Sequence, residues 1–326
     1  MTQTNASALK FAIVFAGQSS QSIGMMDGFA TNPAVTQTFA EASDILHQDF
    51  AALAAVGPAE LQNQTVNTQP LMLISGVATW RAWQAAGGAN PAYFAGHSLG
   101  EYTALVAAGA LSFTDALPLV RFRAEAMQNA VPEGVGGIAV VMGLDVAQVR
   151  AACAQAVAGA PQDVCEAVNL NSPIQTVIAG HRAAVERAIE HAKALGAKRA
   201  MLLPMSAPSH CALMRPAADA LAKYLEKVVF QAPTTPVIQN ADVEIFNDVA
   251  KIKDALVQQL YRPVRWIETV TKLHGHGVST VVECAPGRVL TGLNKRIVAE
   301  LQSLAVIDAA TLDAAIAAVQ LPKATS

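Results

Sequence analysis

The chain has 326 residues, of which 52% are hydrophobic and only 14% are charged. A chain of this length and composition buries a sizeable core, in one large domain or in one large and one small domain, and excludes extensive disorder. Its formal net charge of −3 at pH 7 argues against a nucleic-acid-binding protein, which is usually basic.

The sequence also argues against export and membrane insertion. The apolar run at residues 11–16 is too short for the central part of a signal peptide. No stretch of about 18 apolar residues could span a bilayer. The four cysteines show no Cys-x-x-Cys spacing, and we interpret them as reduced, buried residues of a cytoplasmic protein.

Apolar runs alternate with helical patterns along most of the chain. The predicted elements are, in chain order, a strand at 11–15, a helix at 69–86, a strand at 93–95, a helix at 115–130 and a strand at 280–282. Continuous apolar strands of this kind are typical of a parallel sheet that is buried on both faces. Their alternation with helices predicts an α/β core.

The stretch 136–204 has a different order of predicted strands and helices. Its predicted elements are a strand at 137–144, a helix at 145–158, strands at 166–171 and 175–180, a helix at 182–195 and a strand at 198–203. The order β-α-β-β-α-β is that of a ferredoxin-like unit. We therefore predict a discontinuous large domain, residues 1–135 and 205–326, with a ferredoxin-like subdomain, residues 136–204, inserted into it.

The second apolar strand leads directly into Gly96-His97-Ser98-Leu99-Gly100, and a helix-forming run follows. A strand, a sharp turn and a helix around Gly-x-Ser-x-Gly expose a nucleophilic serine in an α/β-hydrolase-like core. Ser98 is therefore the candidate nucleophile, although the same pentapeptide elsewhere would be an ordinary turn. A Cβ at either glycine would crowd the strand against the helix. The N–H of Leu99 lies at the start of the helix, where it can donate to an oxyanion.

Two further residues carry candidate roles in this chemistry. Gln18 opens the loop after the first strand, from which a second oxyanion N–H can come, but Gly17 and Ser19 beside it also suit an ordinary polar loop. Arg123 projects from an apolar helical stripe. A guanidinium there needs an anion, because an unpaired buried charge is costly, unless its head reaches water.

A nucleophilic serine also needs a base, and spacing does not select one among the seven histidines. His274 and His276 lie in a predicted glycine-containing loop, but no third ligand accompanies them, so we predict no metal site. His210 follows Pro208-Ser209 where the chain re-enters the large domain. No Asp or Glu stands out as the third member of a triad.

Several stretches besides Gly96–Gly100 resemble the malonyl-CoA:acyl carrier protein transacylases of fatty acid synthesis, and the resemblance extends over residues 11–316. The matching stretches are Gly17-Gln18 with Gln21, Thr68-Gln69-Pro70, Met127-Gln128, Val131–Gly134, Asn169–Pro173, Pro208–Met214, Gln259-Leu260-Tyr261 and Pro286–Leu293.

The resemblance implies a role for each matching site residue. His210 would deprotonate Ser98, oriented by a backbone carbonyl close to Gln259 instead of a carboxylate. Arg123 would hold the malonyl carboxylate as a bidentate clamp, and Gln69 and Gln259 would line the pocket. Malonyl would pass from malonyl-CoA to the serine and then to the phosphopantetheine thiol of acyl carrier protein. The resemblance calls for no metal or redox cofactor, and we expect a monomer.

Two positions depart from the family, which usually has glycine where this chain has Ser19 and Ala285. If the backbone at Ser19 has a positive φ, the residue carries strain of about 1 kcal/mol or more. The sequence leaves three other functions open. They are a trans-acting polyketide acyltransferase, an acyl-thioester hydrolase of the same fold, and a non-catalytic module that docks carrier protein.

Overall fold

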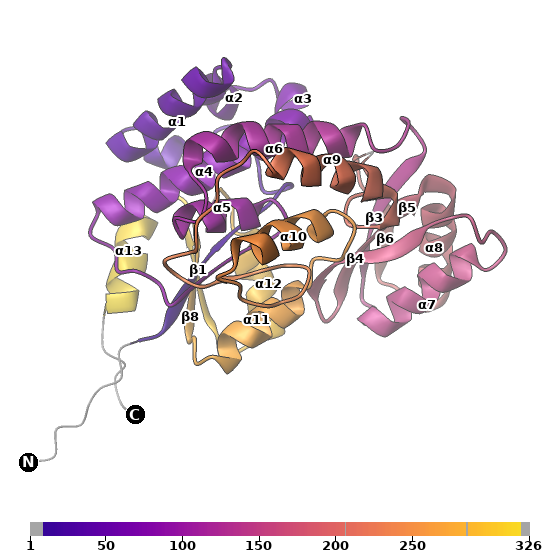
Figure 1. Cartoon of the computed structure of the whole chain (residues 1–326). Coiled ribbons are helices and arrows are strands. Elements are labelled where there is room, and N and C mark those ends of the chain that lie inside the picture. Colours follow the sequence, from indigo (N-terminus) through magenta and orange to yellow (C-terminus); the bar gives the residue numbers. More distant parts are fainter. Residues whose placement is uncertain (1–8, 206, 285, 321–326) are drawn as a thin grey trace, which may run out of the picture. The chain divides into compact units, whose positions relative to one another are not determined.

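The computed structural model describes residues 9–205, 207–284 and 286–320 (Figure 1). The chain divides into two compact units. The first unit comprises residues 1–117, 233–237 and 271–326, and the second comprises residues 118–232 and 238–270. Each unit has its own sheet.

The first unit is built on a parallel sheet of five strands in the order β7-β2-β1-β8-β9. The strands are β1 (Phe11–Phe15), β2 (Tyr93–Gly96), β7 (Val237–Ile238), β8 (Thr280–Cys284) and β9 (Gln302–Val306). β1 lies between β2 and β8, pairs with both in parallel, and is buried along its whole length. β1 and β8 are labelled in Figure 1. These three central strands are the predicted apolar runs, so the predicted parallel α/β core is confirmed.

Helices precede and follow these strands along the chain. They are α1 (Pro33–Leu46), α2 (Phe50–Ala55), α3 (Ala59–Gln62), α4 (Thr65–Ala85), α5 (Gly100–Ala107), α12 (Val289–Ile297) and α13 (Ala309–Gln320), with α6 (Phe113–Gln128) and α11 (Trp266–Gly275) at the divisions between units. α4 begins four residues before its predicted start, with Pro70 inside it. Proline usually marks the first turn of a helix, which makes the true start hard to read.

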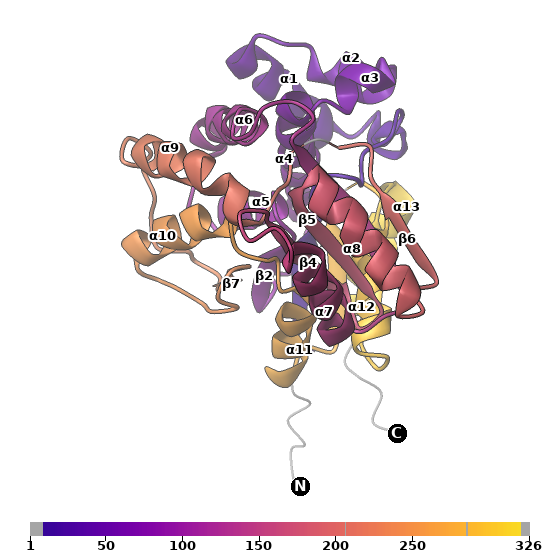
Figure 2. The same cartoon turned by 90° about the vertical axis from the view of Figure 1, so that its right-hand side faces the viewer.

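The second unit contains a four-stranded antiparallel sheet in the order β4-β5-β3-β6. Its elements are β3 (Gly136–Met142), α7 (Val146–Val157), β4 (Cys165–Ser172), β5 (Gln175–His181), α8 (Arg182–Ala194) and β6 (Arg199–Leu202). α7 and α8 lie side by side (Figure 2) and bury one apolar face of the sheet. The predicted β-α-β-β-α-β order is confirmed.

The opposite face of this sheet contributes to positioning the candidate site. Ile138, Val168 and Ala179 on the strands form an apolar cluster with Cys211, and Leu213 packs against it. The chain segment that follows β6 is therefore anchored to the sheet immediately after His210.

The second unit is larger than the predicted subdomain 136–204. It also holds most of α6, together with α9 (Arg215–Leu225) and α10 (Val249–Gln259). Hydrophobic periodicity identifies helices but not the unit that each helix packs with, so the domain limits of the sequence analysis stay a prediction.

The four cysteines, all within the described residues, are free and buried, as predicted. Burial raises the pKa of the Cys211 thiol to about 12 and raises that of Cys284 as well. In the described parts of the chain no helix combines the length and the hydrophobicity that crossing a membrane requires.

Candidate active site

Ser98 lies at the sharp turn between β2 and α5, with a φ of 52°. A residue other than glycine in this left-handed region is strained by about 1–3 kcal/mol, and such strain is typical of functional turns. A strained serine between a strand and a helix is the arrangement of a nucleophile elbow. The half-buried position of Ser98 leaves part of the residue accessible.

The two glycines of the elbow are required by close approach of the backbone. A Cβ on Gly96 would lie 1.9 Å from the carbonyl carbon of Gly100, and a Cβ on Gly100 would lie 2.0 Å from the carbonyl oxygen of Phe15. Real Cβ atoms do not come this close to backbone. The predicted crowding of strand against helix is therefore confirmed.

The loop after β1 passes directly beside the elbow. A Cβ on Gly17 would lie 2.5 Å from the carbonyl oxygen of His97 and 3.6 Å from the nitrogen of Leu99. Gln18 follows Gly17, and its side chain donates to Oγ1 of Thr65 (3.2 Å). The loop that carries Gln18 is thus next to the N–H of Leu99, which lies just before the first residue of α5.

The same loop contains the first departure from the family pattern. Ser19 has a φ of 82°, so the condition for strain at this position is met. Its backbone N–H donates to Oε1 of Gln21 (2.7 Å). The second departure, Ala285, lies outside the described residues.

His210 and Gln259 meet in the second unit. Nδ1 of His210 lies 2.6 Å from the carbonyl oxygen of Gln259, and the backbone N–H of His210 donates to the carbonyl oxygen of Leu260 (2.8 Å). A carbonyl accepts only, so Nδ1 carries the proton and Nε2 is left as the basic nitrogen. The orienting carbonyl expected close to Gln259 is that of Gln259 itself.

Arg123 is buried, with 1% of its surface exposed. Its head therefore does not reach water, and that alternative is excluded. Nη2 of Arg123 donates to Oε1 of Gln259 (2.9 Å). Gln259, which is itself buried, thus holds the buried cation through its side chain and the imidazole through its carbonyl group.

The structure groups the predicted site residues by unit. Ser98, Leu99 and Gln18 come together in the first unit, which also contains Gln69 on α4, buried to 1% exposure. The second group is Arg123, His210 and Gln259. The pairing of Ser98 with His210 stays a prediction.

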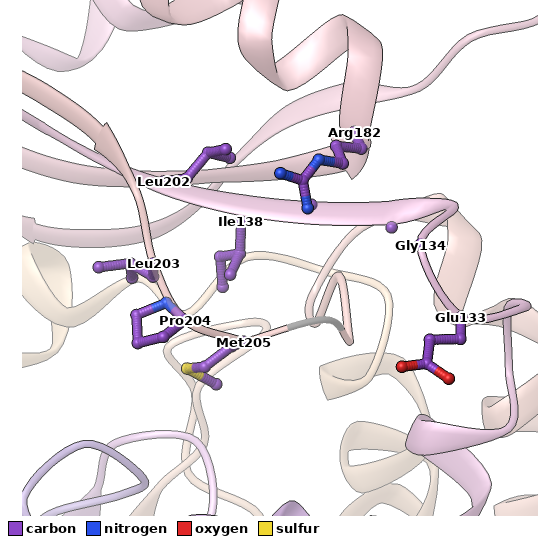
Figure 3. A pocket seen from close by; sticks show the side chains of 10 residues that line it. Glu133, Gly134, Ile138, Arg182, Leu202, Leu203, Pro204 and Met205 are labelled. Atoms are coloured by element: carbon purple, nitrogen blue, oxygen red, sulfur yellow. The ribbon is translucent and has the colours of Figure 1, made fainter.

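A cavity of about 550 Å³ in the second unit was not predicted. Its walls are Glu133, Gly134, Gly136, Gly137, Ile138, Arg182, Leu202, Leu203, Pro204 and Met205 (Figure 3). Residues 202–205 come from the end of β6 and lead into the segment that carries His210. Glycines and the end of a strand form most of this wall, and these residues match no binding motif from which the sequence could have predicted the cavity.

One of the two histidines predicted to lie in a loop differs from expectation. His274 belongs to the last turn of α11 and not to a loop, because the helical pattern continues to Gly275. Nδ1 of His276 lies 3.1 Å from the hydroxyl of Tyr93. Among the described residues no group of three or more His, Cys, Asp or Glu could hold a metal ion.

The parallel sheet and the strained turn at Ser98 have the arrangement of α/β enzymes with a serine nucleophile, and the comparisons with known proteins identify the class as an acyltransferase. The acyl transferase domain family matches residues 12–315. The malonyl CoA-acyl carrier protein transacylase of Salmonella typhimurium is 54% identical, over 94% of this chain and 99% of the relative.

Solved structures give the same result. The acyl-carrier-protein S-malonyltransferase of Burkholderia pseudomallei is 56% identical with a TM-score of 0.93, over 95% of this chain and 100% of that one. A malonyl-transacylase solved in complex with a type II polyketide synthase acyl carrier protein is 52% identical with a TM-score of 0.92, over 95% and 99%. The chain belongs to the malonyl CoA-acyl carrier protein transacylase family.

Proposed function

We propose that this enzyme transfers malonyl from malonyl-CoA to the phosphopantetheine thiol of an acyl carrier protein through a malonyl-Ser98 intermediate. The observation that carries the proposal is the double role of Gln259. Its carbonyl group orients His210 (2.6 Å) and its side chain holds Arg123 (2.9 Å). A base and a buried cation, the two groups that transfer of an anionic acyl group would use, are thus both held by Gln259.

In the first step, Nε2 of His210 takes the proton of the Ser98 hydroxyl as Oγ attacks the thioester carbonyl. The N–H groups of Leu99 and Gln18 stabilise the negative charge on the carbonyl oxygen. The tetrahedral intermediate collapses, the carbon–sulfur bond breaks, and His210 returns the proton to the departing CoA thiol. The malonyl group remains as an ester on Ser98.

In the second step, the phosphopantetheine thiol gives its proton to His210 and attacks the malonyl ester. The ester bond breaks, His210 returns the proton to Ser98, and malonyl leaves as a thioester of the carrier protein. A dyad oriented by a carbonyl group supports both directions of proton transfer, because the carbonyl oxygen of Gln259 can accept from Nδ1 of His210 in both the neutral and the protonated imidazole.

Arg123 supplies the selectivity for a charged acyl group. Its guanidinium is buried, and Nη2 donates to the side-chain oxygen of Gln259. The planar fork of the guanidinium matches the geometry of a carboxylate, so it would hold the carboxylate of malonyl in a bidentate pair. We place the remaining side chains, Gln69 and Gln259, in the lining of the same pocket, and we expect a monomer acting in the cytoplasm.

Intact-mass measurement after rapid mixing with malonyl-CoA tests this function. The wild type is expected to gain one malonyl group, and Ser98→Ala none. Addition of phosphopantetheinylated carrier protein should move the malonyl mass to the carrier. Release of free malonate without carrier would identify a hydrolase instead. An adduct that persists in Ser98→Ala would reject Ser98 as the nucleophile.

A further inference from the structure

The backbone of His210 is held in an unfavourable conformation. Its φ is 66°, a left-handed value that persists in a non-glycine residue only where the surroundings enforce it. Two bonds to the segment 259–261 act on His210 itself, one from its backbone N–H to Leu260 and one from Nδ1 to Gln259. Both hydrogen bonds reach adjacent residues, Gln259 and Leu260, so they do not by themselves fix the chain that follows His210.

A third contact joins the same two segments further along. Arg215 begins α9, five residues after His210, and its guanidinium carbon lies 4.4 Å from the centre of the Tyr261 ring. Tyr261 is two residues after Gln259. A guanidinium over an aromatic face at this distance is a cation–π contact. The segments 210–215 and 259–261 are therefore held together at one end by the hydrogen bonds of His210 and at the other by the contact of Arg215 with Tyr261.

The charge of Arg215 has a second neighbour. Glu166 on β4 is partly buried, which raises the pKa of its carboxyl group, while the backbone N–H of Ala212 and the charge of Arg215 oppose that rise. The charge of Arg215 therefore acts on the carboxyl group of Glu166 as well as on the ring of Tyr261. The contact with Tyr261, at 4.4 Å, is the one that holds Arg215 beside the base segment.

We propose that Arg215 and Tyr261 are positioning residues for His210, which hold the base segment in its strained conformation so that the imidazole stays on the carbonyl group of Gln259. The proposal rests on the function proposed above. Neither residue touches the reacting atoms in this scheme. Their effect reaches the reaction only through the orientation of His210, where a displacement of about 1 Å can lower a rate by about a hundredfold.

The test is the single-turnover rate of malonyl transfer to Ser98 in Tyr261→Leu, Tyr261→Phe and Arg215→Met. Loss of the aromatic face in Tyr261→Leu should lower the rate constant about tenfold, with the KM for malonyl-CoA unchanged. Tyr261→Phe keeps the aromatic face and should retain the wild-type rate. Arg215 is exposed, so Arg215→Met should fold even if Tyr261→Leu does not.

A matched control and a second background separate positioning from general destabilisation. Phe246 is a half-buried ring of the same unit that faces Lys251 at 5.9 Å, so Phe246→Leu should leave the acylation rate unchanged. In a His210→Ala background, Tyr261→Leu should have no further effect, because the residue it positions is absent. The proposal would be overturned if Tyr261→Leu lowered the acylation rate equally in both backgrounds. It would also be overturned by a wild-type acylation rate in both Tyr261→Leu and Arg215→Met, or by a similar loss of rate in Phe246→Leu. A wild type that forms no malonyl adduct would instead overturn the proposed function.

Discussion

Gln259 lies between the base and the buried cation, and it contacts them through different atoms. Its carbonyl oxygen is 2.6 Å from Nδ1 of His210 and its Oε1 is 2.9 Å from Nη2 of Arg123. A side-chain substitution therefore changes the surroundings of Arg123 and leaves the carbonyl group that orients His210. The two functions of the residue can be separated by mutation.

Gln259→Glu should make the enzyme discriminate against malonyl. A carboxylate at this position would pair with Arg123 and compete with the carboxylate of the substrate. Since a hydrogen bond to a charged group contributes about 1.5–3 kcal/mol, the KM for malonyl-CoA should rise roughly tenfold or more. The measurement is steady-state kinetics with malonyl-CoA and acetyl-CoA. An unchanged KM for malonyl-CoA would show that Arg123 does not meet the substrate carboxylate.

Ser19→Gly should relieve strain in the loop that carries Gln18. Glycine adopts a φ of 82° without a steric penalty, so stability should stay the same or rise by up to about 1 kcal/mol, with the acylation rate kept or increased. Ser20, whose φ is not positive, is the matched control. Ser20→Gly should lose about 0.4–1 kcal/mol through the entropy of the unfolded chain. Loss of both stability and rate in Ser19→Gly would contradict the strain argument.

The stability of the first unit should depend on pH through Glu283. This buried carboxylate on β8 accepts from the N–H groups of Leu290 (3.0 Å) and Thr291 (2.7 Å) at the start of α12. Burial nevertheless raises its pKa above the ordinary 4.5, against the opposing effect of these bonds. A raised pKa in the folded state means that the free energy of unfolding is larger when Glu283 is protonated. The contribution of Glu283 is therefore complete below about pH 4.5 and declines as pH rises through the folded pKa.

Denaturant unfolding of the wild type and Glu283→Gln at several pH values checks this. The free energy of unfolding of the wild type, relative to the variant, should fall as pH rises from the ordinary carboxyl range toward neutrality. A difference that grows with pH would mean that the hydrogen bonds outweigh burial and that the pKa is lowered.

The parts that could be predicted from the sequence are those with a local signal. β1 is a continuous apolar run because both its faces are buried, and the elbow at Ser98 is marked by two glycines that close approach demands. β7 has only two residues, too few for any periodicity.

The candidate base could not be selected in this way. His210 and Gln259 are 49 positions apart, and their contact depends on how α10 packs beside the segment after β6. Only the resemblance to a family pointed to His210. For Arg123, in contrast, the sequence reveals its place in an apolar stripe, and the structure then decides that its head is buried.

The central claim is that Arg123 pairs with the carboxylate of malonyl during transfer to Ser98. The most direct measurement is kcat/KM for malonyl-CoA and acetyl-CoA in the wild type and in Arg123→Ala. Leaving one partner of a buried charge pair unmatched costs about 3–5 kcal/mol, so the wild type should prefer malonyl by roughly a few hundredfold to a few thousandfold. Arg123→Ala should lose that preference. Equal wild-type values for malonyl-CoA and acetyl-CoA would contradict the account.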